Sequence, residues 1–237
     1  MMKNLSFIFI VGTVVACVVL IAVLSVVKDK TQEEKAAVAA TQLEKKSLDH
    51  MVLSEAKMQE AQTLLAKKSI SLEDQSKAIA LIEESIMEAR KAVAVQPDKP
   101  QTWNYLSEAY QKLRDVNPKN VELAKDALNH AIELAPQNHI YYGRRATVLI
   151  MQKKYQDAEK DLKTALKIDP DNANYYFKLG NVYKSMDKKA EAKQTYLVAK
   201  KLTSEENKMG MAQIDAQLKS LDISATQEAK TKNKRDR

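Results

Sequence analysis

Residues 142–170, YGRRATVLIMQKKYQDAEKDLKTALKIDP, and residues 176–204, YFKLGNVYKSMDKKAEAKQTYLVAKKLTS, carry one pattern at a spacing of 34 residues. The same step relates Ala124, Ala158 and Ala192, and it also relates Ala131, Ala165 and Ala199. A fixed period of this length indicates stacked structural units. Alanine lets two helices of a unit cross closely, and Pro136 and Pro170, also 34 apart, end the second helix. The sequence therefore predicts an all-α fold, a short α-solenoid of helical hairpins.

This pattern resembles the tetratricopeptide repeat (TPR) family, whose motif is W-x2-L-G-x2-Y, then A-x3-F-x2-A and a terminal P. The unit at 100–138 has Ser107 in place of glycine and an insertion in its inner turn. The unit at 139–172 departs at Arg145, where the motif has a buried leucine, and the unit at 173–206 has Ser204 in place of proline. The residues that carry the resemblance are Trp103, Leu106, Tyr110, Ala124, Ala131, Pro136, Tyr142, Ala146, Ala158, Ala165, Pro170, Tyr176, Leu179, Gly180, Tyr183, Ala192, Tyr196 and Ala199.

The chain on either side of these units predicts further helices. Residues 51–99 are expected to form a degenerate TPR-like helix pair, and residues 28–50 a helical stalk. Residues 204–224 contain one apolar stripe, which suits a capping helix over the open face of the last unit. Residues 225–237 are polar and basic, and we expect this tail to be disordered.

Residues 7–27, FIFIVGTVVACVVLIAVLSVV, form an uncharged run after a short amino-terminal tail at 1–6. A helix of about 20 apolar residues spans the hydrocarbon core of a bilayer, so this run predicts a single transmembrane helix. The alternative is a lipoprotein, because the residues before Cys17 resemble a bacterial lipobox. The chain stays apolar after Cys17, which favours the membrane helix.

Two observations disagree on which side of the membrane the repeats lie. Lys28, Lys30 and Lys35 follow the apolar run, which favours repeats in the cytoplasm. A short tail before a single apolar span also resembles the signal-anchor of bacterial envelope proteins. We therefore expect the bacterial cytoplasmic (inner) membrane with the repeats facing outward, with the cytoplasmic side as the alternative.

The composition argues against an enzyme. The 237 residues include four Gly, one Cys and three His, so glycine-rich nucleotide loops, internal disulfides and multi-ligand zinc sites are excluded. His50, His130 and His139 fall in different elements. Asp157 and Glu159 lie among lysines, which is typical of a solvated helix face. We expect no catalytic residues, no cofactor and no metal.

The net charge is +7, and residues 100–203 contain 18 basic and 12 acidic residues. Lysine pairs near helix ends can offset the helix dipole. The positive charge therefore has two explanations, this structural one and a functional basic patch. We expect a membrane-anchored adaptor or scaffold that binds a protein segment. The alternatives are a lipoprotein in envelope or pilus-type assembly and a binder of anionic surfaces through the basic repeats and tail. No specific nucleic acid is expected, because the aromatic residues occupy repeat-core positions. The oligomeric state stays open.

The TPR resemblance implies a concave groove lined by the first helix of each unit. Carried over by motif position, its ligand-contacting residues are Asn104, Glu108, Gln111, Arg144, Thr147, Ile150, Met151, Phe177, Lys178, Asn181 and Lys184. This mixture suits an acidic segment with one or two apolar residues, which Phe177 and Met151 would anchor while Arg144 and Lys184 steer binding. Arg144 is similar to part of a clamp for terminal carboxylates, but Tyr105 and Ile140 stand where polar or basic residues are expected. A receptor for chaperone tails is therefore disfavoured.

Overall fold

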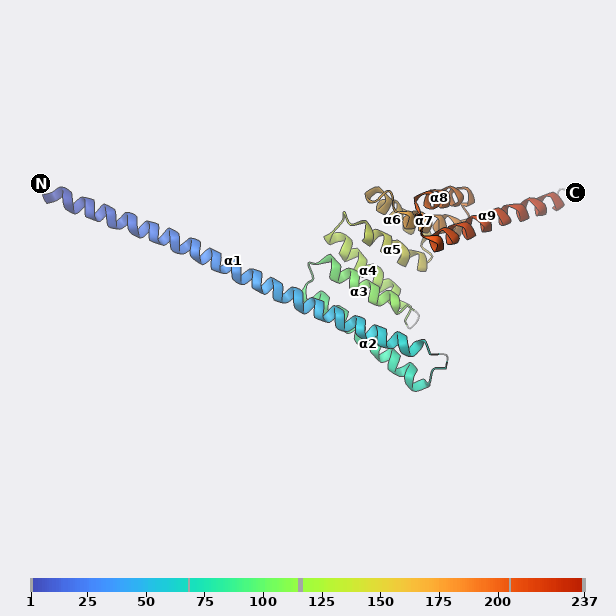
Figure 1. Ribbon diagram of the computed structural model, residues 1–237, viewed down its shortest axis with the longest axis horizontal. Helices are drawn as coiled ribbons and strands as arrows, with labels where there is room; N and C mark the ends of the chain where they lie inside the picture. The colour runs from blue at the N-terminus through green and yellow to red at the C-terminus, as the bar shows by residue number, and fades with distance from the viewer. Residues whose placement is uncertain (1, 68, 115–116, 205, 236–237) are drawn as a thin grey trace. The chain divides into compact units, whose positions relative to one another are not determined.

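The computed structural model describes the backbone of residues 2–67, 69–114, 117–204 and 206–235, and the side chains of residues 28, 32–67, 69–114, 117–204 and 206–222. Every regular element in these ranges is an α-helix (Figure 1). The helices are α1 (Met2–Leu65), α2 (Leu72–Val95), α3 (Pro100–Lys112), α4 (Lys119–Leu134), α5 (His139–Met151), α6 (Tyr155–Ile168), α7 (Ala173–Ser185), α8 (Lys189–Leu202) and α9 (Lys208–Arg235). The chain divides into two compact units, residues 1–49 and residues 50–237. The first unit consists of the amino-terminal part of α1.

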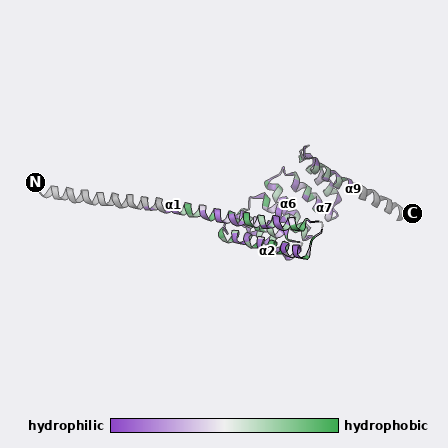
Figure 2. Ribbon diagram, turned by 60° about the horizontal axis from the view of Figure 1, so that its bottom comes forward, coloured by the Kyte–Doolittle hydropathy of each residue, from purple (hydrophilic) through white to green (hydrophobic). Residues whose placement is uncertain are grey.

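The second unit is a solenoid of consecutive helical hairpins, α3–α4, α5–α6 and α7–α8, which follow one another along the chain (Figure 1). Leu128, Leu162 and Tyr196 lie 34 residues apart on α4, α6 and α8, and all three are fully buried. The coloured parts of the helices in Figure 2 carry both hydrophobic and hydrophilic residues, as a helix with one buried face requires. The solenoid predicted from the 34-residue period is confirmed.

The helix crossings explain which small residue each hairpin uses. A Cβ atom added at Gly180 would lie 2.5 Å from a ring carbon of Tyr196, closer than packing permits. The preceding hairpin has Ala146 at the equivalent position, and there the smaller Leu162 replaces tyrosine. The glycine of α7 is therefore required by the tyrosine of α8.

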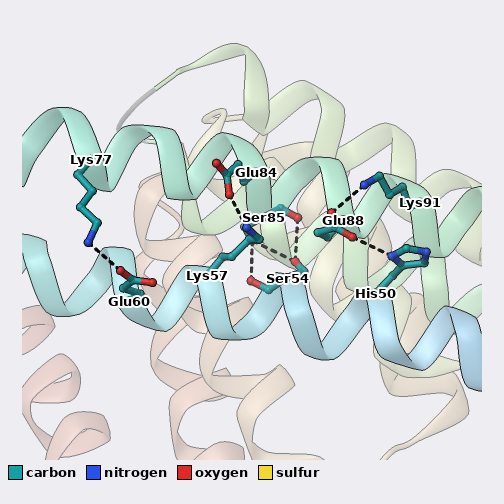
Figure 3. A network of polar contacts seen from close by, with 9 residues as sticks. All are labelled: His50, Ser54, Lys57, Glu60, Lys77, Glu84, Ser85, Glu88 and Lys91. Carbon is teal, nitrogen blue, oxygen red and sulfur yellow. Dashed lines mark hydrogen bonds and ion pairs between the residues drawn. The ribbon is translucent and has the colours of Figure 1, made fainter.

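A further hairpin precedes these three, formed by residues 50–65 of α1 together with α2. Ser85 lies seven residues before Ala92, as Ala124 lies seven before Ala131, so Ser85 takes the place of the small residue at the crossing. Ser54 faces it: the two Oγ atoms are 3.0 Å apart, and each hydroxyl donates to the other residue's carbonyl oxygen at 2.9 Å (Figure 3). Both residues are buried, and the mutual hydrogen bonds satisfy their hydroxyls.

Ion pairs flank this serine pair along the hairpin. They join His50 to Glu88, Lys91 to Glu88, Lys57 to Glu84 and Lys77 to Glu60 (Figure 3). These seven residues together with Ser54 and Ser85 are called the polar seam below. The seam joins α1 to α2 through polar side chains, and Ser54, Ser85 and Glu88 of the seam are buried. Because the repeat motif has apolar or small residues in its buried positions, this explains why residues 51–99 match it poorly.

The last helix, α9, adds Ile214 and Leu221 to the apolar core around the α7–α8 hairpin. It continues to Arg235, whereas the sequence predicts a disordered tail from residue 225. Residues 225–235 contain no glycine or proline and are rich in Ala, Gln, Glu and Lys, which favour helix.

The membrane location predicted from residues 7–27 is contradicted. None of the helices, over the residues whose description permits the test, is long and apolar enough to cross a membrane. The side chains of residues 7–27, including Cys17 and its proposed lipid, lie outside the described residues.

Candidate functional site

An open hollow of about 320 Å³ lies across the first helices of the three regular hairpins. Its lining comes from α3, α5 and α7, and consists of Glu108, Gln111, Lys112, Arg144, Thr147 and Lys178. Glu108 with Gln111 and Lys112, and Arg144 with Thr147, stand three or four residues apart, so these helices turn a polar stripe towards the hollow. We call this the first hollow.

The cations of the first hollow form a row in which each reaches back to the preceding hairpin. Lys112 on α3 donates to both carboxylate oxygens of Glu55 on α1 at 3.1 Å. Arg144 on α5 forms an ion pair with Glu108 on α3. Two of the three cations are therefore neutralised within the chain.

The third cation differs. Lys178 on α7 donates to the hydroxyl of Thr147 on α5 at 2.9 Å, so a neutral oxygen stands where the other two cations have a carboxylate. Burial, and then the neighbouring charge of Arg144, lower the pKa of Lys178. Within the described part of the chain, Lys178 has no carboxylate partner. Of the three cations, Lys178 is therefore the one that has a hydroxyl in place of a carboxylate.

Five residues of the predicted groove line the first hollow, namely Glu108, Gln111, Arg144, Thr147 and Lys178. Asn104 lies beside it, with its amide 3.4 Å from a carboxylate oxygen of Glu108. The remaining five predicted residues do not line it: Ile150, Met151, Phe177, Asn181 and Lys184.

Packing explains most of these exceptions. The ring of Phe177 lies 5.8 Å from that of Tyr196, and Asn181 accepts a hydrogen bond from the Tyr196 hydroxyl at 2.7 Å. Lys184 donates to Gln217 and Ser220 of α9, each at 2.8 Å. The Lys184 ammonium, which the motif position predicted to contact a ligand, is therefore bound by α9.

Sequence reasoning missed one lining residue, Lys112. It stands 39 residues before Met151, at a place in its hairpin next to that of the predicted groove residue Gln111, on the same helix. Tyr105, which stands where the terminal-carboxylate clamp would need a polar residue, donates its hydroxyl to the carbonyl oxygen of Met51 at 2.7 Å. Its role is to join α3 to α1.

A second hollow, of about 260 Å³, is lined by Lys125, Asn129, Arg145, Leu149, Asp157, Lys160 and Asp161. Its charges are matched internally. Arg145 donates twice to Asp161 at 2.7 Å and once to Asn129 at 2.9 Å, and Asp161 raises the pKa of Arg145. This network replaces the buried leucine of the motif and engages the guanidinium within the chain.

The histidines do not gather into a site. His50 belongs to the polar seam, the ring of His130 lies 4.4 Å from that of Trp103, and His139 contacts the Tyr175 hydroxyl at 2.9 Å. Among the residues open to description, no group of three or more His, Cys, Asp or Glu could hold a metal ion.

Comparison with known proteins finds two family models that match part of the chain. A family model described as "TPR repeat" matches residues 146–187, and one described as "Tetratricopeptide repeat" matches residues 173–205. The small glutamine-rich tetratricopeptide repeat-containing protein 2 of Saccharomyces cerevisiae is 37% identical over 78 residues, which is 33% of this chain and 22% of that protein. The Hsp70-Hsp90 organizing protein of Triticum aestivum is 33% identical over 75 residues, 32% of this chain and 13% of that protein. The chain thus spans less than a quarter of either relative.

The fold also has a solved counterpart. The crystal structure of a thermophilic TPR protein of Thermus thermophilus is 20% identical, with a TM-score of 0.51 over 70% of this chain and 98% of that one. At this identity the likeness concerns the fold alone.

Proposed function

We propose that this chain, which matches tetratricopeptide repeat models over residues 146–205, is a protein-binding adaptor that takes an acidic segment of its partner in the first hollow. The observation that carries the proposal is the missing carboxylate beside Lys178. Lys112 and Arg144 already have Glu55 and Glu108, whereas Lys178 has only the hydroxyl of Thr147. An aspartate, glutamate or terminal carboxylate of a partner would complete the row.

The energetics favour such a ligand. A half-buried ammonium without a counter-ion is destabilised by desolvation, as its lowered pKa reflects. A carboxylate placed against it forms a charge-assisted hydrogen bond in a setting where solvent screens weakly. The unliganded chain therefore carries a cost that an acidic partner relieves.

Of the two apolar residues predicted to anchor a partner, Phe177 and Met151, we retain Met151. Phe177 packs partly against the core, whereas the side chain of Met151, at the end of α5, remains 36% exposed. Met151 stands one helical turn after the lining residue Thr147 on α5, so a partner residue next to the acidic one would contact it. Methionine suits this contact because its side chain adapts to varied shapes.

A chaperone tail is one candidate for the acidic segment. One relative is named an Hsp70-Hsp90 organizing protein, which favours it. Tyr105, committed to Met51, and the apolar Ile140 oppose a clamp for two carboxylates. A single carboxylate at Lys178 suits acidic segments more generally.

Photo-crosslinking from two positions tests this proposal. A photoreactive p-benzoyl-phenylalanine is placed at Gln111 in the first hollow or, as the matched control, at Lys160 in the second. Crosslinked products are identified by mass spectrometry. We expect a specific protein partner to be captured from Gln111, with the crosslinked residue near an aspartate, a glutamate or a chain terminus. Equal capture from Lys160, or capture that competing acidic peptide leaves unchanged, would refute the assignment.

A further inference from the structure

The first hairpin, residues 50–95, has little apolar core of its own. It contains no Phe, Tyr or Trp. One buried cluster consists of Met58, Ala61, Ala78 and Ile82, completed by Leu113, which follows α3. Ala89 and Val93 of α2 belong instead to the cluster that contains Tyr110 and Leu128 of the next hairpin. The later hairpins, by contrast, bury tyrosines such as Tyr183 and Tyr196. Because aromatic side chains supply much of the packed area of a core, the first hairpin gains less from burial.

The polar seam supplies much of what holds α1 to α2. Lys77, Glu60, Lys91 and Glu84 are each about half exposed at the side chain. Ion pairs this exposed contribute little and weaken as salt is added. Among the charged residues of the seam, Glu88 is the buried one, and it accepts from both His50 and Lys91 at 2.8 Å.

Among the described residues, polar contacts join this hairpin to α3, beside the apolar cluster that Ala89 and Val93 share with Tyr110. The Tyr105 hydroxyl donates to the Met51 carbonyl at 2.7 Å, Lys112 to Glu55 at 3.1 Å, and Arg90 to the Tyr110 hydroxyl at 2.9 Å. In a solenoid each unit contacts only its neighbours, so a terminal unit can open without disturbing the rest.

We propose that residues 50–95 open as a unit, in a salt-sensitive manner, while residues 100–222 stay folded, and that opening releases Lys112 from Glu55. The released ammonium would then face the first hollow beside Lys178. Opening would thus double the unpaired positive charge available to an acidic partner. The significance of that charge rests on the proposed function, whereas the opening itself does not.

Hydrogen–deuterium exchange of the full chain, followed by mass spectrometry at low and high sodium chloride, tests the opening. Peptides from 51–65 and 72–95 should exchange at least about tenfold faster than peptides from 139–202, a difference of about 1.4 kcal/mol. Raising the salt should widen the difference. Uniform protection across 51–202, or a salt effect of equal size in both regions, would overturn the proposal.

A conservative variant of Glu88 tests whether the polar seam holds the first hairpin closed. Glu88→Gln removes the carboxylate that serves both His50 and Lys91, and should raise exchange in 51–65 and 72–95 about fivefold, with no change in 139–202. The matched control is Asp215→Asn, which removes the pair with Lys200 at the other end of the solenoid and should leave 51–95 unchanged. If Glu88→Gln instead raises exchange equally along the chain, the hairpin is not a separate unit.

Lysine labelling with an N-hydroxysuccinimide acetate tests, without any ligand, whether opening releases Lys112 from Glu55. Labelling of Lys112 should rise in Glu88→Gln, and labelling of Lys178 should not. If exchange in the hairpin rises and Lys112 labelling stays constant, the release of Lys112 is wrong.

Discussion

The ammonium of Lys178 donates to the hydroxyl of Thr147 at 2.9 Å. The two other cations of the first hollow, Lys112 and Arg144, each bind a carboxylate instead. A half-buried cation without its own counter-ion lowers stability and is retained where a ligand needs it. Removing this charge should therefore raise the free energy of unfolding of the chain without its partner.

Replacing this lysine by methionine should stabilise the free chain at pH 7. The pKa of Lys178 is lowered by burial from its ordinary 10.5, so below the folded-state pKa the charge penalises the folded state. As the pH rises through that pKa towards 10.5, the unfolded chain holds more protons and wild-type stability increases. The advantage of Lys178→Met in urea unfolding should thus shrink over this interval. Lys184→Met is the control and should not stabilise, because Lys184 is exposed to solvent and its charge therefore carries little desolvation penalty.

Gly180→Ala should destabilise the fold by about 1–3 kcal/mol, since the new methyl group would overlap the buried ring of Tyr196. Adding Tyr196→Leu should recover much of the loss, because the pair then matches Ala146 and Leu162 of the preceding hairpin. Chemical denaturation of both single variants and the double variant gives the coupling energy. Additive effects would show that the two residues do not constrain each other.

Arg145→Leu restores the residue of the repeat motif but should cost about 3 kcal/mol or more. The substitution leaves Asp161, which is only 6% exposed, without the guanidinium that donates to both its oxygens. The double variant Arg145→Leu, Asp161→Ala should regain most of that stability. If the single variant is as stable as wild type in thermal unfolding, the pair contributes nothing.

Lys153→Gly and Asp187→Gly should each stabilise by up to about 1 kcal/mol, because glycine adopts a positive φ without strain. Both residues hold a positive φ, 58° and 59°, at the turn after the first helix of their hairpins. Lys154→Gly is the control, since Lys154 has φ −84° and glycine there only adds unfolded-state entropy. A midpoint lower than wild type for the first two variants would contradict the argument.

The sequence predicted the regular hairpins because the period records their packing directly. Ala158 and Ala192 mark helix crossings, and Leu162 and Tyr196 fill the space between helices, so the 34-residue step is visible in residue type. The first hairpin was harder to recognise. The buried Ser54 and Ser85 bond to each other where α1 meets α2, so polar residues replace the alanine pattern there.

The candidate site was predicted in part. Arg144 and Lys178 follow from motif position alone, and so would Lys112. Position along a motif does not, however, reveal that α9 satisfies Lys184 or that Phe177 lies against Tyr196. Those outcomes depend on contacts between elements that the repeat pattern does not encode.

The affinity of the crosslinked partner for charge-matched variants tests the central claim most directly. Lys178→Gln and Lys167→Gln each remove one positive charge, but Lys167 is exposed on α6, away from the first hollow. Calorimetric titration should show about 30-fold weaker binding for Lys178→Gln, equivalent to about 2 kcal/mol, and less than about threefold for Lys167→Gln. Equal losses in the two variants, or unchanged affinity in Lys178→Gln, would contradict the claim that an acidic segment binds at Lys178.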